Sequence, residues 1–377
     1  MKFHNDPGFN SQIKRTLGYC VTGGAELSEC FATIQNIRSG DYQSWYSEWR
    51  SLADKLSEDA NEISFRENTI SKGEKLLRAS NYYRTAYFFL EENPDDFRIF
   101  ECLELSKKAF KVALENLKIK FITLEIPFED GFLPGYLILS NEPKSNLLID
   151  TGGGDSTLEE LYFLSTFPAI KRGYHSLIFE GPGQGSVLRF QKKPFRYDWE
   201  SVIKQVIDYL EMKYPDIAND IILKGDSFGG YLAARAACFE KRIKACVLNP
   251  AILNPMNPLN KLKINWLRFI IFKISPDTKF KVHSRFMRFG AKSFSDLVKT
   301  CKKFNLDGIV NQISCPTLVI DNEEESITKG EAFKLYEQLQ CQKKYFLFTK
   351  AHYSGGHCQP FAQMNTQALM FDWIATL

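Results

Sequence analysis

A single serine stands between glycines in the stretch LKGDSFGGYLAARAA, residues 223–237. Gly225, Ser227 and Gly229 satisfy the pattern G-x-S-x-G, an apolar run precedes them, and an alanine-rich stretch follows. This setting predicts a strand, a sharp turn and a helix, which together expose a serine hydroxyl as a nucleophile. The glycines are needed because a Cβ at either position would collide with the neighbouring strand or helix. Ser227 is therefore the candidate nucleophile, and the alternative is a serine in an ordinary tight turn.

A serine nucleophile needs a general base, which is most often a histidine. The chain has five histidines, and two of them follow the last predicted strand, in TKAHYSGGHCQP. His357 stands in a glycine-rich loop just before the terminal helix, so we prefer it to His352, which is closer to the end of the strand. The alternative for both residues is a histidine in a surface loop.

The base in turn needs a carboxylate to orient it. The apolar run CPTLVID leads into an acidic loop whose carboxylates are Asp321, Glu323, Glu324 and Glu325. In triads with the chain order serine, acid, histidine, the acid usually stands three residues after a turn glycine. Asn322 takes the place of that glycine here, so Glu325 is preferred and Glu324 is the runner-up. The alternative is a solvated acidic loop.

Negative charge that develops on a substrate oxygen requires two backbone N–H donors. One is expected from Phe228, directly after the serine. The other is expected from the loop LLIDTGGGDST, at Gly153 or Gly154, where glycine lets the backbone approach a substrate. A phosphate-binding loop is the alternative, but the pattern G-x-x-x-x-G-K-[ST] is missing. The stretch FEGPGQGSV, residues 179–187, also follows a strand and predicts a tight turn near the pocket.

Composition narrows the class of protein. The formal net charge of +3 over 377 residues predicts neither a nucleic-acid nor a membrane partner, and no stretch is long and apolar enough to span a membrane. The N-terminus lacks the apolar core of a secretory signal. The nine cysteines are scattered without C-x-x-C spacing, which favours free thiols in a reducing compartment. We expect a cytoplasmic protein without a metal or a cofactor.

The elements that must position these residues fall into two parts. Residues 1–117 have helical periodicity and predict a helical N-terminal or cap domain. Residues 118–377 begin with a hairpin around EDG and continue with short apolar runs alternating with helices. This pattern predicts an α/β fold with a mostly parallel central sheet. Residues 251–308 interrupt this alternation of strands and helices and predict a helical insertion, which is either a lid or a surface helix pair.

These motifs, in this order, resemble the FrsA-like α/β-hydrolase family, the group of 2,6-dihydroxypseudooxynicotine hydrolase and the fungal yellowish-green heptaketide hydrolases. LLIDTGGGDSTLEE, FEGPGQG, GDSFGGYLAARAA, CPTLVIDNEEES and GGHCQ carry the resemblance, and RASNYYRTAYFFL is similar to the helical N-terminal segment of that family. It covers the chain from about residue 40 onward. The resemblance implies an α/β-hydrolase fold whose helical N-terminal part caps the active site.

Residue by residue, the resemblance places the nucleophile on Ser227, the base on His357 and the acid on Glu325. It also implies that Tyr82, Tyr83 or Arg84 of the cap faces the substrate. The chain departs from the common pattern in two respects. Asp150-Thr151 replaces the His-Gly of many esterases before the glycine loop, and a glutamate replaces the commoner aspartate.

The resulting hypothesis is a serine hydrolase that forms an acyl-enzyme on an ester or on a C–C bond of a β-diketone or polyketide-like substrate. One alternative is an acyltransferase or cyclase of secondary metabolism that uses the same triad. Another is an inactive binding or regulatory protein on a hydrolase scaffold. The expected partner is a small carbonyl compound, and the sequence leaves a homodimer open.

Overall fold

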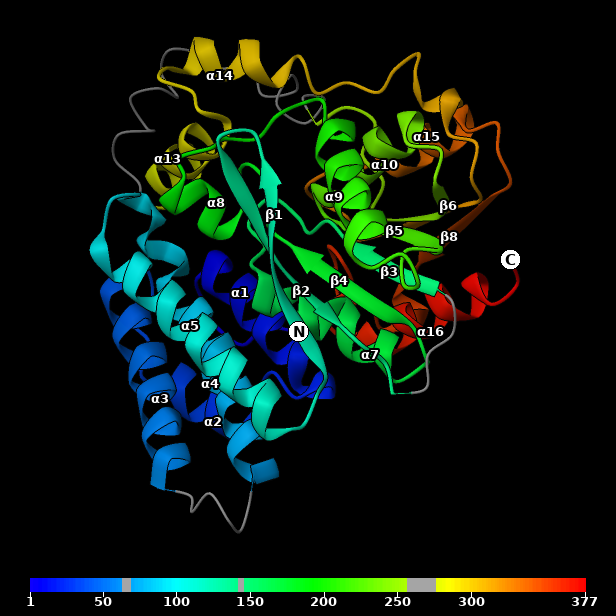
Figure 1. The fold of residues 1–377 in the computed structure, drawn as a ribbon. Helices are drawn as coiled ribbons and strands as arrows, with labels where there is room; N and C mark the ends of the chain where they lie inside the picture. Colours follow the sequence, from blue (N-terminus) through cyan, green and yellow to red (C-terminus); the bar gives the residue numbers. More distant parts are fainter. Residues whose placement is uncertain (63–68, 142–145, 256–275) are drawn as a thin grey trace. The chain divides into compact units, whose positions relative to one another are not determined.

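The computed structural model describes residues 1–62, 69–141, 146–255 and 276–377 (Figure 1). The chain divides into two compact units. Unit 1 contains Met1–Lys120 and Ile264–Met287, and unit 2 contains Phe121–Lys263 and Arg288–Leu377. The domain boundary that the sequence predicts lies between residues 117 and 118, and its division into a cap and a catalytic domain stays a prediction.

Unit 1 is helical, and its local sequence explains where several helices begin. Asp6 caps the first helix by accepting a hydrogen bond from the Phe9 N–H, and Asp96 caps the last long helix through the Arg98 N–H. The helices are α1 (Pro7–Gly18), η1 (Tyr19–Thr22), α2 (Leu27–Ile34), α3 (Tyr42–Glu62), α4 (Thr69–Tyr87), η2 (Phe88–Glu92) and α5 (Phe97–Asn116).

The late return of the chain to unit 1 has an aromatic cause. Helix α13 (Pro276–Phe289) places Phe280 against the rings of Tyr42, Phe88 and Phe89, with ring centroids 5.3–6.3 Å apart. This aromatic packing explains why residues 276–287 group with the helical unit. Residues 256–275 of the predicted insertion lie outside the described residues, so its role as a lid stays a prediction.

Unit 2 is built on an eight-stranded sheet with the order β1-β2-β4-β3-β5-β6-β7-β8. The first two strands form the predicted hairpin and run antiparallel, and the strands from β4 to β8 pair in parallel. The strands are β1 (Phe121–Phe128), β2 (Gly131–Ile138), β3 (Asn146–Asp150), β4 (His175–Phe179), β5 (Asp220–Asp226), β6 (Ile243–Asn249), β7 (Thr317–Asn322) and β8 (Lys343–Phe348).

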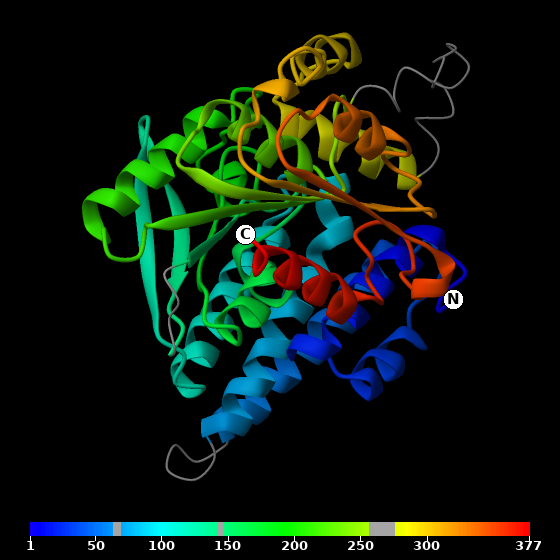
Figure 2. The same cartoon turned by 90° about the vertical axis from the view of Figure 1, so that its right-hand side faces the viewer.

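Helices cover both faces of this sheet. The helices of unit 2 are α6 (Leu158–Leu161), η3 (Tyr162–Thr166), α7 (Phe167–Ile170), α8 (Gly185–Phe190), α9 (Glu200–Lys213), α10 (Gly229–Phe239), α14 (Phe294–Cys301), η4 (Val310–Gln312), α15 (Glu331–Gln338), η5 (Lys350–His352) and α16 (Gln363–Ile374). Leu147 and Ile149 of β3 pack with α9 and α10, whereas Leu148 packs on the opposite face with α16. Figure 2 shows α16, in red, on one face of the sheet.

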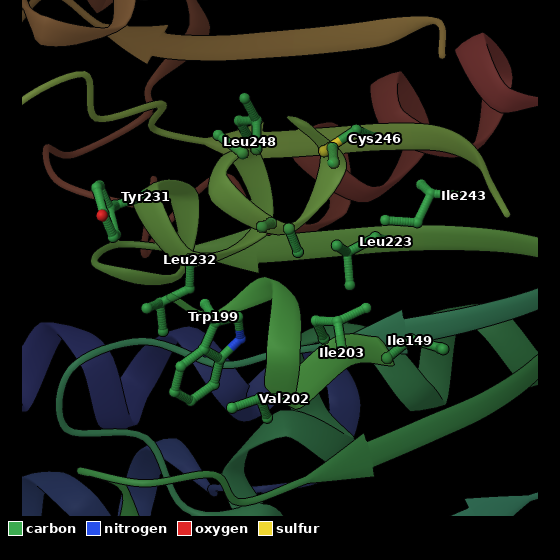
Figure 3. Packing of buried hydrophobic residues seen from close by; sticks show 14 of the residues in the cluster. Ile149, Trp199, Val202, Ile203, Leu223, Tyr231, Leu232, Ile243, Cys246 and Leu248 are labelled. Atoms are coloured by element: carbon green, nitrogen blue, oxygen red, sulfur yellow. The ribbon is translucent and has the colours of Figure 1, made fainter. Parts of the chain in front are cut away.

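The core between the sheet and helices α9 and α10 is densely apolar. Trp199 and Ile203 are fully buried and lie near Leu223 of β5 and Leu232 of α10 (Figure 3). Strands buried on both faces must be apolar along their whole length, which is why the apolar runs in the sequence predicted them. The predicted α/β fold class with a mostly parallel sheet is confirmed. Among the helices described, none has both the length and the apolar character needed to cross a bilayer.

Candidate active site

Ser227 stands in a sharp turn between β5 and α10. Its φ of +56° lies in the left-handed region, which side chains rarely adopt, and its N–H donates to the Asn249 carbonyl at 2.8 Å. A Cβ on Gly225 would meet the carbonyl of Gly229, and a Cβ on Gly229 would meet the carbonyl of Gly152. Only glycine fits at both positions, so the turn holds Ser227 at the carboxyl end of the sheet, as the sequence pattern predicts.

Two hydrogen bonds join Ser227, His357 and Glu325. His357 Nε2 lies 2.8 Å from Ser227 Oγ, and His357 Nδ1 lies 2.6 Å from Glu325 Oε2. In the arrangement that uses both ring nitrogens, the serine hydroxyl donates to Nε2 and the Nδ1–H donates to the carboxylate. The structure thus brings together the three residues that the sequence selected from the loops after β5, β7 and β8.

The surroundings of the acid favour its ionised form. Glu325 Oε1 accepts hydrogen bonds from the N–H groups of Ile327 at 2.7 Å and Thr328 at 3.0 Å. Burial raises the pKa of the Glu325 carboxyl, but His357 and these backbone donors lower it more, so the pKa lies below its ordinary value. Glu325 is therefore a fixed negative charge beneath the imidazole.

The Glu325 charge affects the pKa of the His357 imidazole. Burial lowers the pKa of His357, but the adjacent Cys358 sulfur and the Glu325 carboxylate raise it more, and the pKa lies well above its ordinary value. A base whose protonated form is stabilised in this way accepts a proton from Ser227 readily. It must itself be neutral before it can do so, which makes the arrangement sensitive to acid.

The rival candidates make other contacts in these two loops. Glu324 donates its N–H to Asn322 Oδ1 at 2.8 Å, and Asp321 accepts from the hydroxyl of Tyr345 at 2.9 Å. His352 Nδ1 accepts from the Thr349 N–H at 3.0 Å, which closes the turn after β8. These residues shape the loops, and Glu325 is the carboxylate that bonds to His357.

The glycine loop lies against the nucleophile, but its N–H groups are not equivalent. A Cβ on Gly153 would lie 3.2 Å from Ser227 Cβ, and one on Gly154 would lie 3.5 Å from Phe228 Cβ. The Gly153 N–H donates to Ser156 Oγ at 2.6 Å. Within the described part of the chain, the N–H groups of Gly154 and Phe228 have no acceptor. Of the two predicted glycines, Gly154 is thus the one whose N–H remains available.

A buried ion network underlies the loop and the turn, and sequence reasoning missed it. Lys224 Nζ donates to Asp150 Oδ2 at 3.0 Å, to Ser165 Oγ at 2.8 Å and to Asp226 Oδ2. Asp150 and Lys224 are register partners on β3 and β5, so their side chains share one face. Asp150 Oδ1 also accepts from the Gly152 N–H at 2.8 Å. The signal in the sequence was a lysine within the apolar run DIILKGD.

Burial and the mutual attraction of the charges act in opposite directions on the pKa values of Lys224 and Asp226. Burial lowers the pKa of Lys224, but the two carboxylates raise it more, so the pKa lies above its ordinary value and the amine is charged. Burial raises the pKa of Asp226 above its ordinary value, against the lowering effect of Lys224. The structure thus places one cation between two carboxylates directly behind Ser227.

The three residues that the resemblance assigned to substrate binding lie in the core of unit 1. The Tyr82 hydroxyl donates to Glu29 Oε2 at 2.8 Å, and the Tyr83 hydroxyl donates to Asp54 Oδ1 at 2.8 Å. Arg84 is buried and donates to Thr85 Oγ1 at 3.0 Å. These bonds within the unit favour a structural role, and substrate binding by the three residues stays a prediction. Across the described residues, no three His, Cys, Asp or Glu side chains are grouped to hold a metal ion.

Comparisons with known proteins identify the relatives of the chain. It is 34% identical to the 20-hydroxy-prefusarin hydrolase of Gibberella moniliformis, over 82% of this chain and 81% of that one. It is 32% identical to the α/β-hydrolase xenA of Xenoacremonium sinensis, over 82% and 80%. The solved structure of 2,6-dihydroxy-pseudo-oxynicotine hydrolase superposes with a TM-score of 0.78, covering 95% of this chain and 94% of that one at 20% identity. No family model matches the chain.

Proposed function

The chain belongs to the α/β-hydrolase family, as the sequence motifs predicted, and on that premise we propose that Ser227, His357 and Glu325 act as a catalytic triad. The reaction is hydrolysis at an activated carbonyl through an acyl-enzyme. The observation that carries this proposal is the continuous hydrogen-bonded chain from Ser227 Oγ through both nitrogens of His357 to Glu325.

The first half of the reaction forms the acyl-enzyme. Ser227 Oγ attacks the carbonyl carbon while His357 Nε2 takes the hydroxyl proton, and Glu325 stabilises the imidazolium that results. The N–H groups of Phe228 and Gly154 donate to the oxyanion. The tetrahedral intermediate then collapses, and the leaving group departs with the proton from His357.

The second half regenerates the enzyme. His357 takes a proton from water, the resulting hydroxide attacks the acyl carbon, and the bond to Ser227 breaks as the proton returns to Oγ. The leaving group in the first half is an alcohol if the substrate is an ester. It is a carbanion, protonated by His357, if a C–C bond of a β-diketone is cleaved.

The substrate we propose is bulky and apolar or aromatic. Support comes from unit 2, where the partly exposed ring of Phe228, directly after the nucleophile, lies 4.9 Å from Phe195 and 5.7 Å from Phe289 between ring centroids. Aromatic rings of this kind bind flat apolar groups through large contact areas. One relative carries the name of a hydrolase for 20-hydroxy-prefusarin, which supports a secondary metabolite as substrate.

The test is hydrolysis of a panel of aryl esters and aryl β-diketones by the purified protein. Ser227→Ala is expected to lose activity, whereas Ser201→Ala, which removes a hydroxyl bonded to the Asp198 carbonyl at the start of α9, keeps it. Retention of activity in Ser227→Ala overturns the proposal. If product forms only when an alcohol or amine acceptor is added, the reaction is acyl transfer and not hydrolysis.

A further inference from the structure

Gln184 lies in the turn after β4 and faces the glycine loop. Its side chain is buried, and every polar atom of its amide is engaged. Nε2 donates to the carbonyls of Thr151 at 2.8 Å and Gly153 at 3.0 Å, and Oε1 accepts from the Gly181 N–H at 2.9 Å. The amide therefore joins the turn GPGQG to the loop TGGGD at two carbonyls.

The hydrogen bond from Gln184 to the Gly153 carbonyl also affects the N–H of Gly154. The C=O of Gly153 and the N–H of Gly154 belong to one planar trans peptide and point in opposite directions. A donor that holds the carbonyl therefore fixes the direction of the N–H. It also polarises the peptide, because hydrogen bonds in a chain strengthen one another.

The neighbouring peptides are restrained by other groups. The N–H of Gly153 is taken by Ser156 Oγ, and the carbonyl of Gly154 accepts from Arg288 Nη1 at 2.6 Å. Between these two restraints, Gln184 holds the peptide from Gly153 to Gly154, whose N–H has no acceptor among the residues that the structure describes. The loop is built so that one donor remains for a ligand.

We propose that Gln184 is a positioning residue that aims the Gly154 N–H at the developing oxyanion. This inference rests on the proposed function, since it presumes an anionic intermediate on Ser227. Gln184 does not touch the substrate, so its removal lowers the rate of the chemical step and leaves the first binding step unchanged.

The test compares Gln184→Met with Gln191→Met. Gln191 is the matched control because its amide also bonds to a backbone, through the N–H and the carbonyl of Phe132, at the other end of α8. The probe is an alkyl fluorophosphonate. Ser227 Oγ forms a bond to phosphorus, the phosphoryl oxygen carries the developing charge, fluoride leaves, and His357 takes the serine proton.

The readouts are the inactivation constant KI and the limiting rate kinact, with circular dichroism as the check of folding. Gln184→Met is expected to lower kinact about 10- to 100-fold, since the donor is misdirected rather than removed, with KI unchanged. Gln191→Met is expected to match the wild type. A rise in KI with kinact unchanged, or wild-type values for both, overturns the inference.

A second variant covers the case in which Gln184→Met does not fold. Gln184→Glu keeps the length of the side chain and the acceptor for the Gly181 N–H but, when ionised, has no donor for the Gly153 carbonyl. We expect the same loss in kinact. Failure of Ser227 to react in the folded wild type overturns the proposed function and the inference with it, whereas equal reaction in wild type and variants overturns the inference alone.

Discussion

Replacing Lys224 by methionine tests whether the buried ion network holds the active-site turn together. The lysine side chain is 6% exposed, and its partners Asp150 and Asp226 are 0% and 8% exposed. Methionine fills a similar volume but leaves two carboxylates buried without their cation. Breaking a buried ion pair by removing one partner costs about 3–5 kcal/mol of unfolding free energy. We therefore expect a loss of stability of that size.

The assay is urea unfolding and thermal unfolding followed by circular dichroism. For a unit of this size, about 3–5 kcal/mol corresponds to a fall in Tm on the order of 10 °C. Lys204→Met is the matched control, because its partner Asp208 is also a carboxylate but the lysine side chain is 64% exposed. An exposed pair contributes about 0–1 kcal/mol, so this variant should unfold close to the wild type.

The stability that Lys224→Met loses should also depend on pH. The pKa of Asp226 is already raised by burial, and loss of Lys224 removes one of the interactions that lower it. A carboxyl whose pKa is raised on folding makes the native state less stable as pH rises through that pKa. The deficit of Lys224→Met should therefore be smaller at about pH 5 than at about pH 8. A stability within about 1 kcal/mol of the wild type at both pH values refutes the reasoning.

Two further predictions concern the triad and the turn. Because the pKa of His357 is raised, kcat/KM should increase with pH along an acid limb centred above the ordinary histidine value. Glu325→Gln should shift this limb to lower pH and reduce kcat by about 10⁴-fold. A pH–rate profile checks both, and an acid limb that Glu325→Gln does not move contradicts the assignment. Gly229→Ala pushes a Cβ into the Gly152 carbonyl, so it should cost about 1–3 kcal/mol of stability and slow the reaction of Ser227 with a fluorophosphonate. Wild-type unfolding and labelling in that variant would count against the close contact.

The sequence predicted the features that depend on local pattern. Strands buried on both faces need continuous apolar runs, so the runs NLLID and DIILKG were sufficient to predict β3 and β5. The turn at Ser227 was predictable because no residue other than glycine fits at Gly225 and Gly229. Glu325 was preferred from its spacing after β7, and the structure hydrogen-bonds that carboxylate to His357.

Features that depend on which strands and loops are neighbours could not be predicted from local sequence pattern. Lys224 interrupts the apolar strand β5, and its partner Asp150 is adjacent only because β3 pairs with β5. The role of Gln184 needed the peptide geometry of the glycine loop, since a glutamine in a turn carries no pattern of its own. Phe280 joins unit 1 through rings almost two hundred residues earlier in the chain, which helical periodicity does not reveal.

The most direct test of the account is to locate the covalent adduct that a fluorophosphonate forms with the purified protein. Intact-mass and peptide mass spectrometry would be applied to the wild type and to Ser227→Ala. The account predicts a single adduct on the peptide that contains Ser227, absent from the variant. A folded wild-type protein that forms no adduct, or an adduct that persists in Ser227→Ala, would contradict the claim that Ser227 is an activated nucleophile.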